Sequence, residues 1–144
     1  MTARHHTDPV LVGVVVIGGA LGSGARYGVS HLLPTQDGFP VGTFVENVVG
    51  AFLLGLLLET LLRAGAEDRT RRMLRLGLGT GVLGGFTTYS ALALEVERLW
   101  ARGEMGLALG YGLGSVVLGT FTATLGIVLA ARARRSRGDG VVES

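Results

Sequence analysis

The chain has 144 residues, of which 48% are hydrophobic and 17% are charged, whereas about 25% of the residues of a typical soluble domain are charged. It has no cysteine, which excludes a disulfide framework, a thiolate metal site and a cysteine nucleophile. A pI of about 9.7 can indicate nucleic-acid binding, but the mean hydropathy of +0.49 favours a membrane protein. The length allows one domain.

Four apolar stretches are long enough to cross a bilayer, which takes about 20 residues of helix. They predict an all-α membrane protein with almost no water-soluble part. The expected spans, in chain order, are residues 9–33, 41–62, 73–100 and 105–131. The first is too long for a signal peptide and lacks a cleavage site. Residues 132–144 are expected to form a solvated cytoplasmic tail.

The basic side chains, all of them arginine, are unevenly distributed between the two sides of such a bundle. Four crossings place both termini and the second loop on one side, which then carries ten arginines: Arg4, Arg63, Arg69, Arg71, Arg72, Arg75, Arg132, Arg134, Arg135 and Arg137. The other side carries only Arg98 and Arg102. The positive-inside rule therefore predicts that both termini are cytoplasmic. Binding of the C-terminal arginines to lipid headgroups or nucleic acid is the alternative interpretation.

Glycines recur at four-residue spacing in three of the expected spans, so each set lies on one helix face. Small residues let helix backbones approach closely in lipid, and these faces are therefore expected at helix–helix contacts. The sets are Gly18 and Gly22, then Gly77, Gly81 and Gly85, then Gly106, Gly110 and Gly114. Because four helices are few for enclosing a transport path, we expect an oligomer, most simply a dimer.

Polar groups inside the expected spans are costly in lipid and often functional. Arg26 in the first span and Glu46 with Asn47 in the second are expected at similar depth, toward the outer side. Two interpretations of this arrangement stay open. Either Arg26 and Glu46 form an ion pair that only supports packing, or they line an outer vestibule whose positive group attracts anions.

The third expected span reads Gly-Gly-Phe-Thr-Thr at residues 84–88, which disfavours a continuous helix. A helix broken in the bilayer frees backbone groups that must be buried in protein or line a wet cavity. Free carbonyls suit a hard cation, whereas amides, hydroxyls and ring edges suit an anion; a simple packing kink is the alternative. In the fourth span Tyr111 and Ser115 share a face, and the three threonines after them are expected to bond back to their own helix.

Three segments, in order and at the right spacing, resemble the Fluc (CrcB) family of fluoride channels over nearly the whole chain. They are residues 18–22 with Arg26 and Tyr27, residues 42–47 running on to 50–52, and residues 84–90. The resemblance implies a passive channel in the cell membrane that lets fluoride leave the cell. It also implies a dual-topology dimer of antiparallel subunits, with a break in the third helix and a central structural sodium ion that is not transported.

The resemblance further implies roles for individual residues. The sodium ligands would be the backbone carbonyls of Gly84 and Thr87. The fluoride pore would be lined by Asn47, Tyr89, Ser90, Leu92, Tyr111 and Ser115. The vestibule would contain Arg26, Glu46 and Glu95.

Some positions depart from the family's pattern. Tyr89 and Leu92 stand where two phenylalanines are usual, with Ala91 in place of a threonine between them, and Glu46 replaces an apolar residue. Leucine has no polarised ring edge, so we expect a pore that depends on Leu92 to be impaired. A subunit that inserts both ways should also have little arginine bias. We therefore expect one orientation in the membrane and pairing with an oppositely oriented homologous subunit.

Two other classes of protein remain as alternatives. A small proton-coupled multidrug exporter also has four spans and forms dimers, but it needs an acidic residue in the first span, where this chain has Arg26, so Glu46 would have to serve. A non-conducting partner subunit packed by its glycines is the other. An enzyme is not expected, because no nucleophile–base pair or metal-ligand cluster occurs, and His5 and His6 precede the first span.

Overall fold

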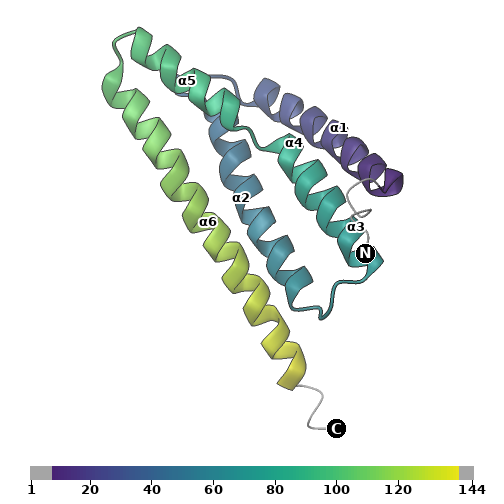
Figure 1. Ribbon diagram of the computed structural model, residues 1–144. Coiled ribbons are helices and arrows are strands. Elements are labelled where there is room, and N and C mark those ends of the chain that lie inside the picture. The colour runs from purple at the N-terminus through teal and green to yellow at the C-terminus, as the bar shows by residue number, and fades with distance from the viewer. Residues whose placement is uncertain (1–7, 140–144) are drawn as a thin grey trace, which may run out of the picture.

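The computed structural model describes residues 8–139, which form an assembly of helices (Figure 1). The three long helices are α1 (Pro9–Leu32), α2 (Val41–Leu62) and α6 (Met105–Asp139). Between α2 and α6 the chain forms α3 (Arg69–Leu74), the π-helix η2 (Arg75–Leu83), α4 (Gly84–Phe86) and α5 (Tyr89–Ala101). No β-strand occurs in the described part of the chain, and the all-helical expectation is confirmed.

Three helices are long and apolar enough to cross a membrane: α1, α2 and residues 105–133 of α6. The chain is therefore a membrane protein. Residues 69–101 do not meet this criterion, because they are divided into shorter helices, of which the longest, α5, has 13 residues. A fourth crossing made by this segment stays a prediction.

Local sequence signals explain where the long helices begin. Asp8 precedes α1, and its carboxylate accepts the Val10 N–H at 3.0 Å, while Pro9 occupies the first helical position, where its missing N–H is not needed. α2 begins after Pro40. Gly103 adopts a positive φ of 79°, which closes the tight turn between α5 and α6.

The observed bounds of α1 and α2 agree with the expected spans to within one residue, and α6 begins where the fourth span was expected. α6 continues to Asp139, beyond the expected end of that span at residue 131. The first part of the predicted tail is therefore helical. Residues 1–7, with Arg4, His5 and His6, and residues 140–144 of that tail lie outside the described residues.

α1 packs along η2 and α4 through glycine faces that we call the closed seam, made of Gly18, Gly22, Gly77, Gly81 and Gly85. A Cβ atom placed on Gly18 would lie 3.1 Å from the Gly81 Cα, and one placed on Gly85 would lie 2.5 Å from the carbonyl oxygen of Gly19. The backbones of the two elements therefore touch, as the four-residue spacing predicted.

α2 packs along α6 in the same way at Gly126, where a Cβ atom would lie 2.8 Å from the Leu56 nitrogen. The first half of α6 is different. A Cβ atom on Gly106, Gly110 or Gly114 would have no neighbouring atom of the described chain within 4 Å. We call these three residues the open face.

Candidate functional site

Between α4 and α5 the helical path is interrupted at Thr87 and Thr88, whose ψ angles of 153° and 114° are those of extended backbone. In a continuous α-helix the Thr88 N–H would donate to the Gly84 carbonyl and the Ala91 N–H to the Thr87 carbonyl. Here the Thr88 N–H donates to Asn47 Oδ1 at 2.8 Å, and the Ala91 N–H donates to Thr88 Oγ1 at 3.1 Å. The carbonyls of Gly84 and Thr87 have thereby lost their usual helical donors.

Asn47 of α2 holds this interruption with two hydrogen bonds. Its Oδ1 accepts the Thr88 N–H, and its Nδ2 donates to the Thr88 carbonyl at 3.1 Å. A carboxamide carries two N–H donors, so one is left for a ligand. The partnership with Thr88 was not predicted from the sequence, where the only available signal was a pair of threonines directly after two glycines and a phenylalanine.

Arg26 of α1 turns toward the same interruption. Its Nε donates to the Gly85 carbonyl at 3.2 Å, and Ser23 Oγ lies 3.5 Å from the same oxygen. The ion pair between Arg26 and Glu46, one of the two interpretations of the sequence, is wrong: none of the ion pairs found within residues 8–139 involves either side chain. The guanidinium instead satisfies a carbonyl at the end of α4.

Glu46 is fully buried, at 0% exposure. Its Oε1 accepts a hydrogen bond from Ser30 Oγ at 2.7 Å. Its Oε2 is buried and has no hydrogen-bond partner among the described residues. Ser30 was missed from the sequence, although it lies one helical turn after Arg26 and so shares its face.

The carboxylate of Glu95 in α5 accepts more hydrogen bonds than that of Glu46. It accepts hydrogen bonds from Thr43 Oγ1 at 2.8 Å and from the Tyr111 hydroxyl at 2.5 Å. Tyr111 is 1% exposed and packs edge-on against Phe39, with the ring centroids 5.3 Å apart. Its hydroxyl is thus held within a partly buried network that links α2, α5 and α6. Thr43 had not been singled out from the sequence.

A groove of about 360 Å³ lies beside the interruption and is bordered by α2, α5 and α6. It is lined by Asn47, Thr87, Thr88, Tyr89, Leu92, Ser115, Val116, Gly119 and Thr120. It therefore brings together four of the predicted pore residues, Asn47, Tyr89, Leu92 and Ser115. Ser90 and Tyr111 do not line it.

The predicted pore residues at the groove differ in what they can offer a ligand. Tyr89 is 82% exposed and presents its ring and hydroxyl. Leu92 also packs against the buried cluster around Tyr111, and it contributes only methyl groups. The Ser115 hydroxyl donates to the Tyr111 carbonyl at 2.7 Å, and the Ser90 hydroxyl lies 3.2 Å from that of Thr88.

The threonines of α6 largely bond back to their own helix, as expected. Thr120 donates to the Val116 carbonyl at 2.8 Å and Thr124 donates to the Thr120 carbonyl at 2.9 Å. Thr122 differs, because its hydroxyl also reaches the Val48 carbonyl of α2 at 3.0 Å. That bond adds a polar contact to the packing of α2 on α6.

The CrcB family model, described as CrcB-like protein, Camphor Resistance, matches residues 13–127. The chain belongs to the CrcB family. The match begins in α1, ends in α6 and contains the interruption and the groove, so the resemblance seen in the sequence is confirmed.

Three relatives are each named as a fluoride-specific ion channel. The chain is 44% identical over 125 residues to FluC 2 of Leifsonia xyli subsp. xyli, which covers 87% of this chain and 86% of the relative. It is 47% identical over 122 residues to FluC of Phenylobacterium zucineum, at 83% and 94% coverage. It is 48% identical over 104 residues to FluC 1 of Cutibacterium acnes, at 72% and 73% coverage.

Proposed function

We propose that this chain is a subunit of a fluoride-specific channel that lets fluoride leave the cell passively and so lowers its cytoplasmic concentration. The observation that carries the proposal is membership of the CrcB family, with relatives named as fluoride-specific ion channels that align over most of their own length. A channel carries out no bond-making chemistry, so no catalytic residue is assigned.

The groove supplies groups suited to a small, strongly hydrated anion, which needs hydrogen-bond donors in place of its water. The free N–H of Asn47 and the hydroxyl and ring edge of Tyr89 are such groups. None carries a full positive charge, and this favours release as well as entry. Arg26 would attract anions from the vestibule, beside Glu46 and Glu95.

Residues 69–101 form a broken fourth span in this proposal. In Figure 1 this segment leads from the end of the molecule where α2 finishes to the end where α6 begins. The backbone N–H and carbonyl of Thr88 find their partner in Asn47, the kind of protein contact that an interruption in a membrane requires. With four spans in the cell membrane, the ten-to-two arginine count favours cytoplasmic termini.

The carbonyls of Gly84 and Thr87 would hold a structural sodium ion that is not transported. The diversion of their helical donors to Asn47 and to the Thr88 hydroxyl supports this assignment, because carbonyl oxygens are suitable ligands for a hard cation. When bound, the ion would supply charge that steadies the interruption. Replacing sodium with N-methylglucamine should lower the midpoint of thermal unfolding, and an unchanged midpoint would reject the ion.

The working unit in this proposal is an antiparallel dimer, in which a second subunit covers the groove and the open face. The arginine bias favours a partner that is homologous and oppositely oriented. The chain has no cysteine, so Ala64→Cys and Ala101→Cys would each report one side of the membrane to an impermeant thiol reagent. Labelling of both variants from the same side of intact cells would show mixed orientations and reject a fixed one.

Purified protein in liposomes, read with a fluoride electrode, tests the transport proposal. Fluoride efflux that Asn47→Asp abolishes and Thr124→Val leaves intact would support the channel, since the Thr124 hydroxyl bonds only its own helix. Efflux that requires co-reconstitution with an oppositely oriented homologue would support the non-conducting partner subunit. Proton-coupled uptake of an organic cation, without fluoride efflux, would reject the channel in favour of the multidrug exporter.

A further inference from the structure

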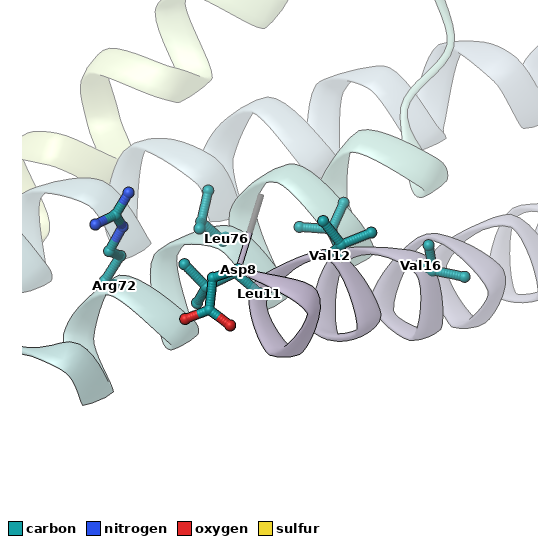
Figure 2. A pocket seen from close by; sticks show the side chains of 7 residues that line it. Asp8, Leu11, Val12, Val16, Arg72 and Leu76 are labelled. Atoms are coloured by element: carbon teal, nitrogen blue, oxygen red, sulfur yellow. The ribbon is translucent and has the colours of Figure 1, made fainter. Parts of the chain in front are cut away.

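A second groove, of about 300 Å³, lies at the start of α1, where α3 and η2 pass it (Figure 2). It is lined by Asp8, Leu11, Val12, Val15, Val16, Arg72 and Leu76. Figure 2 shows Val12 and Val16 following one another along α1, while Asp8 and Arg72 lie toward the other end of the group. The groove therefore has an apolar length and a charged end.

The charged end carries an arginine without a counter-charge. Five arginines lie between residues 63 and 75, and four of them form ion pairs: Arg63 with Glu59, Arg69 with Asp8, Arg71 with Asp68, and Arg75 with Glu67. Within residues 8–139 no hydrogen bond or ion pair engages the side chain of the fifth, Arg72. Since Asp8 is matched by Arg69, one positive charge at the groove remains uncompensated.

The apolar length faces the membrane. α1 is long and apolar enough to span a bilayer, and Val12 and Val16 on its outer face are 52% and 63% exposed. Side chains of this kind at the end of a span meet acyl chains, next to the depth at which headgroup phosphates lie. A soluble anion would use the arginine but would gain nothing from the valines.

We propose that this groove is a binding site for one anionic phospholipid, with the phosphate on the Arg72 guanidinium and an acyl chain along Val12 and Val16. The planar guanidinium donates paired N–H bonds to phosphate oxygens. Basic pockets between membrane helices bind anionic headgroups for this reason. The Asp8 carboxylate does not oppose the lipid strongly, because Arg69 lies 3.5 Å from it.

Native mass spectrometry of the delipidated full-length protein tests the site by titration with dioleoyl phosphatidylglycerol or dioleoyl phosphatidylcholine. The wild type should bind one phosphatidylglycerol in preference. Arg72→Gln should weaken this binding about fivefold, the effect expected of one basic residue at a membrane surface. Arg102→Gln removes the same charge in the turn between α5 and α6, away from the groove. This variant should leave the binding of phosphatidylglycerol unchanged. Val12→Trp, which fills the apolar length, should lower the binding of both lipids.

Equal affinity for the two lipids, or equal losses in Arg72→Gln and Arg102→Gln, would overturn the proposal. Deletion of residues 2–7 adds a third measurement, because these residues directly precede Asp8. A preference for phosphatidylglycerol that appears only after the deletion would mean that the chain's own N-terminal segment fills the groove, which also overturns the proposal. No readout uses fluoride transport, so failure of this site is separable from failure of the proposed function.

Discussion

The closed seam and the open face have the same glycine spacing but opposite surroundings. Along the closed seam, added Cβ atoms would meet the backbone of the neighbouring helix, for example at Gly18 and Gly85. On the open face, Cβ atoms on Gly106, Gly110 and Gly114 would meet no described atom within 4 Å. Spacing therefore predicts that a helix face can be closely approached. It does not say whether the partner belongs to the same chain.

The largest effect is expected from Gly22→Ala in the closed seam. A Cβ atom on Gly22 would overlap the Val82 carbonyl, and backbone cannot move aside as a side chain can. We expect a loss of about 3 kcal/mol in the free energy of unfolding, at the upper end of the usual range for overpacking. Thermal unfolding followed by circular dichroism measures it. Gly24→Ala is the matched control on α1, because a Cβ atom there has no neighbour within 4 Å. Equal stability of the two variants would remove the distinction between closed and open glycines.

Gly110→Leu tests the open face directly. The helical content of the subunit should be unchanged, since a Cβ atom on Gly110 meets no described atom. Assembly should be lost if a second subunit covers this face, because close packing in lipid depends on small residues. Size-exclusion chromatography with light scattering distinguishes monomer from dimer. A Gly110→Leu protein that is still fully dimeric would place the subunit interface elsewhere.

The carboxylates of Glu46, which is buried, and of Glu95, which is half-buried, extend the comparison from packing to hydrogen bonding. Glu95 accepts two hydroxyl donors, whereas Glu46 accepts one and leaves Oε2 unpartnered. Glu95→Gln should cost about 2 kcal/mol, because the amide nitrogen cannot accept one of those bonds. Glu46→Gln should cost less, because the amide oxygen can keep the one hydrogen bond that Glu46 accepts, from Ser30. Each variant is the control for the other. A larger loss of stability in Glu46→Gln than in Glu95→Gln would contradict the prediction.

Leu92→Phe should produce a small effect, a gain of function at the groove bordered by α2, α5 and α6. A ring edge at this position would add a site for fluoride that leucine lacks. We expect fluoride efflux from liposomes to rise about threefold, equivalent to the roughly 0.5–1 kcal/mol that an aromatic edge contributes. Leu92→Met is the control, since it changes shape without adding a ring. Equal gains in both variants would show that the volume of the side chain matters and its ring does not.

The bounds of α1 and α2 could be predicted from the sequence because Pro9, Pro40 and long apolar runs are local signals. The four-residue glycine spacing likewise predicted that these faces lie at helix–helix contacts, as the closed seam does, but not which helices meet there. The π-helical path of residues 75–83 could not be predicted, because it follows from how a glycine-rich stretch fits between two helices. There Gly77 and Gly81 lie against α1, while Gly79 lies near Leu54 and Leu57 of α2.

At the candidate site, the sequence indicated which residues to examine but not their partners. Asn47, Tyr89, Leu92 and Ser115 do meet at one groove. The contact of Arg26 with the Gly85 carbonyl was not predicted, because every residue has a backbone carbonyl and the residue type does not show which one accepts a hydrogen bond. An ion pair with Glu46 was the natural alternative from charge alone. Pairings between distant segments depend on tertiary geometry that periodicity does not encode.

The double hydrogen bond between Asn47 and Thr88 has a consequence for biogenesis. In the proposed fourth span, the Thr88 N–H and carbonyl would enter the membrane without partners unless Asn47 is already present to pair with them. α2 precedes this segment in the chain and therefore leaves the ribosome first. Asn47 is therefore synthesised before the Thr88 peptide groups that it pairs with. In a permuted chain with α2 translated last, the proposed span would have to insert while these groups have no hydrogen-bond partner.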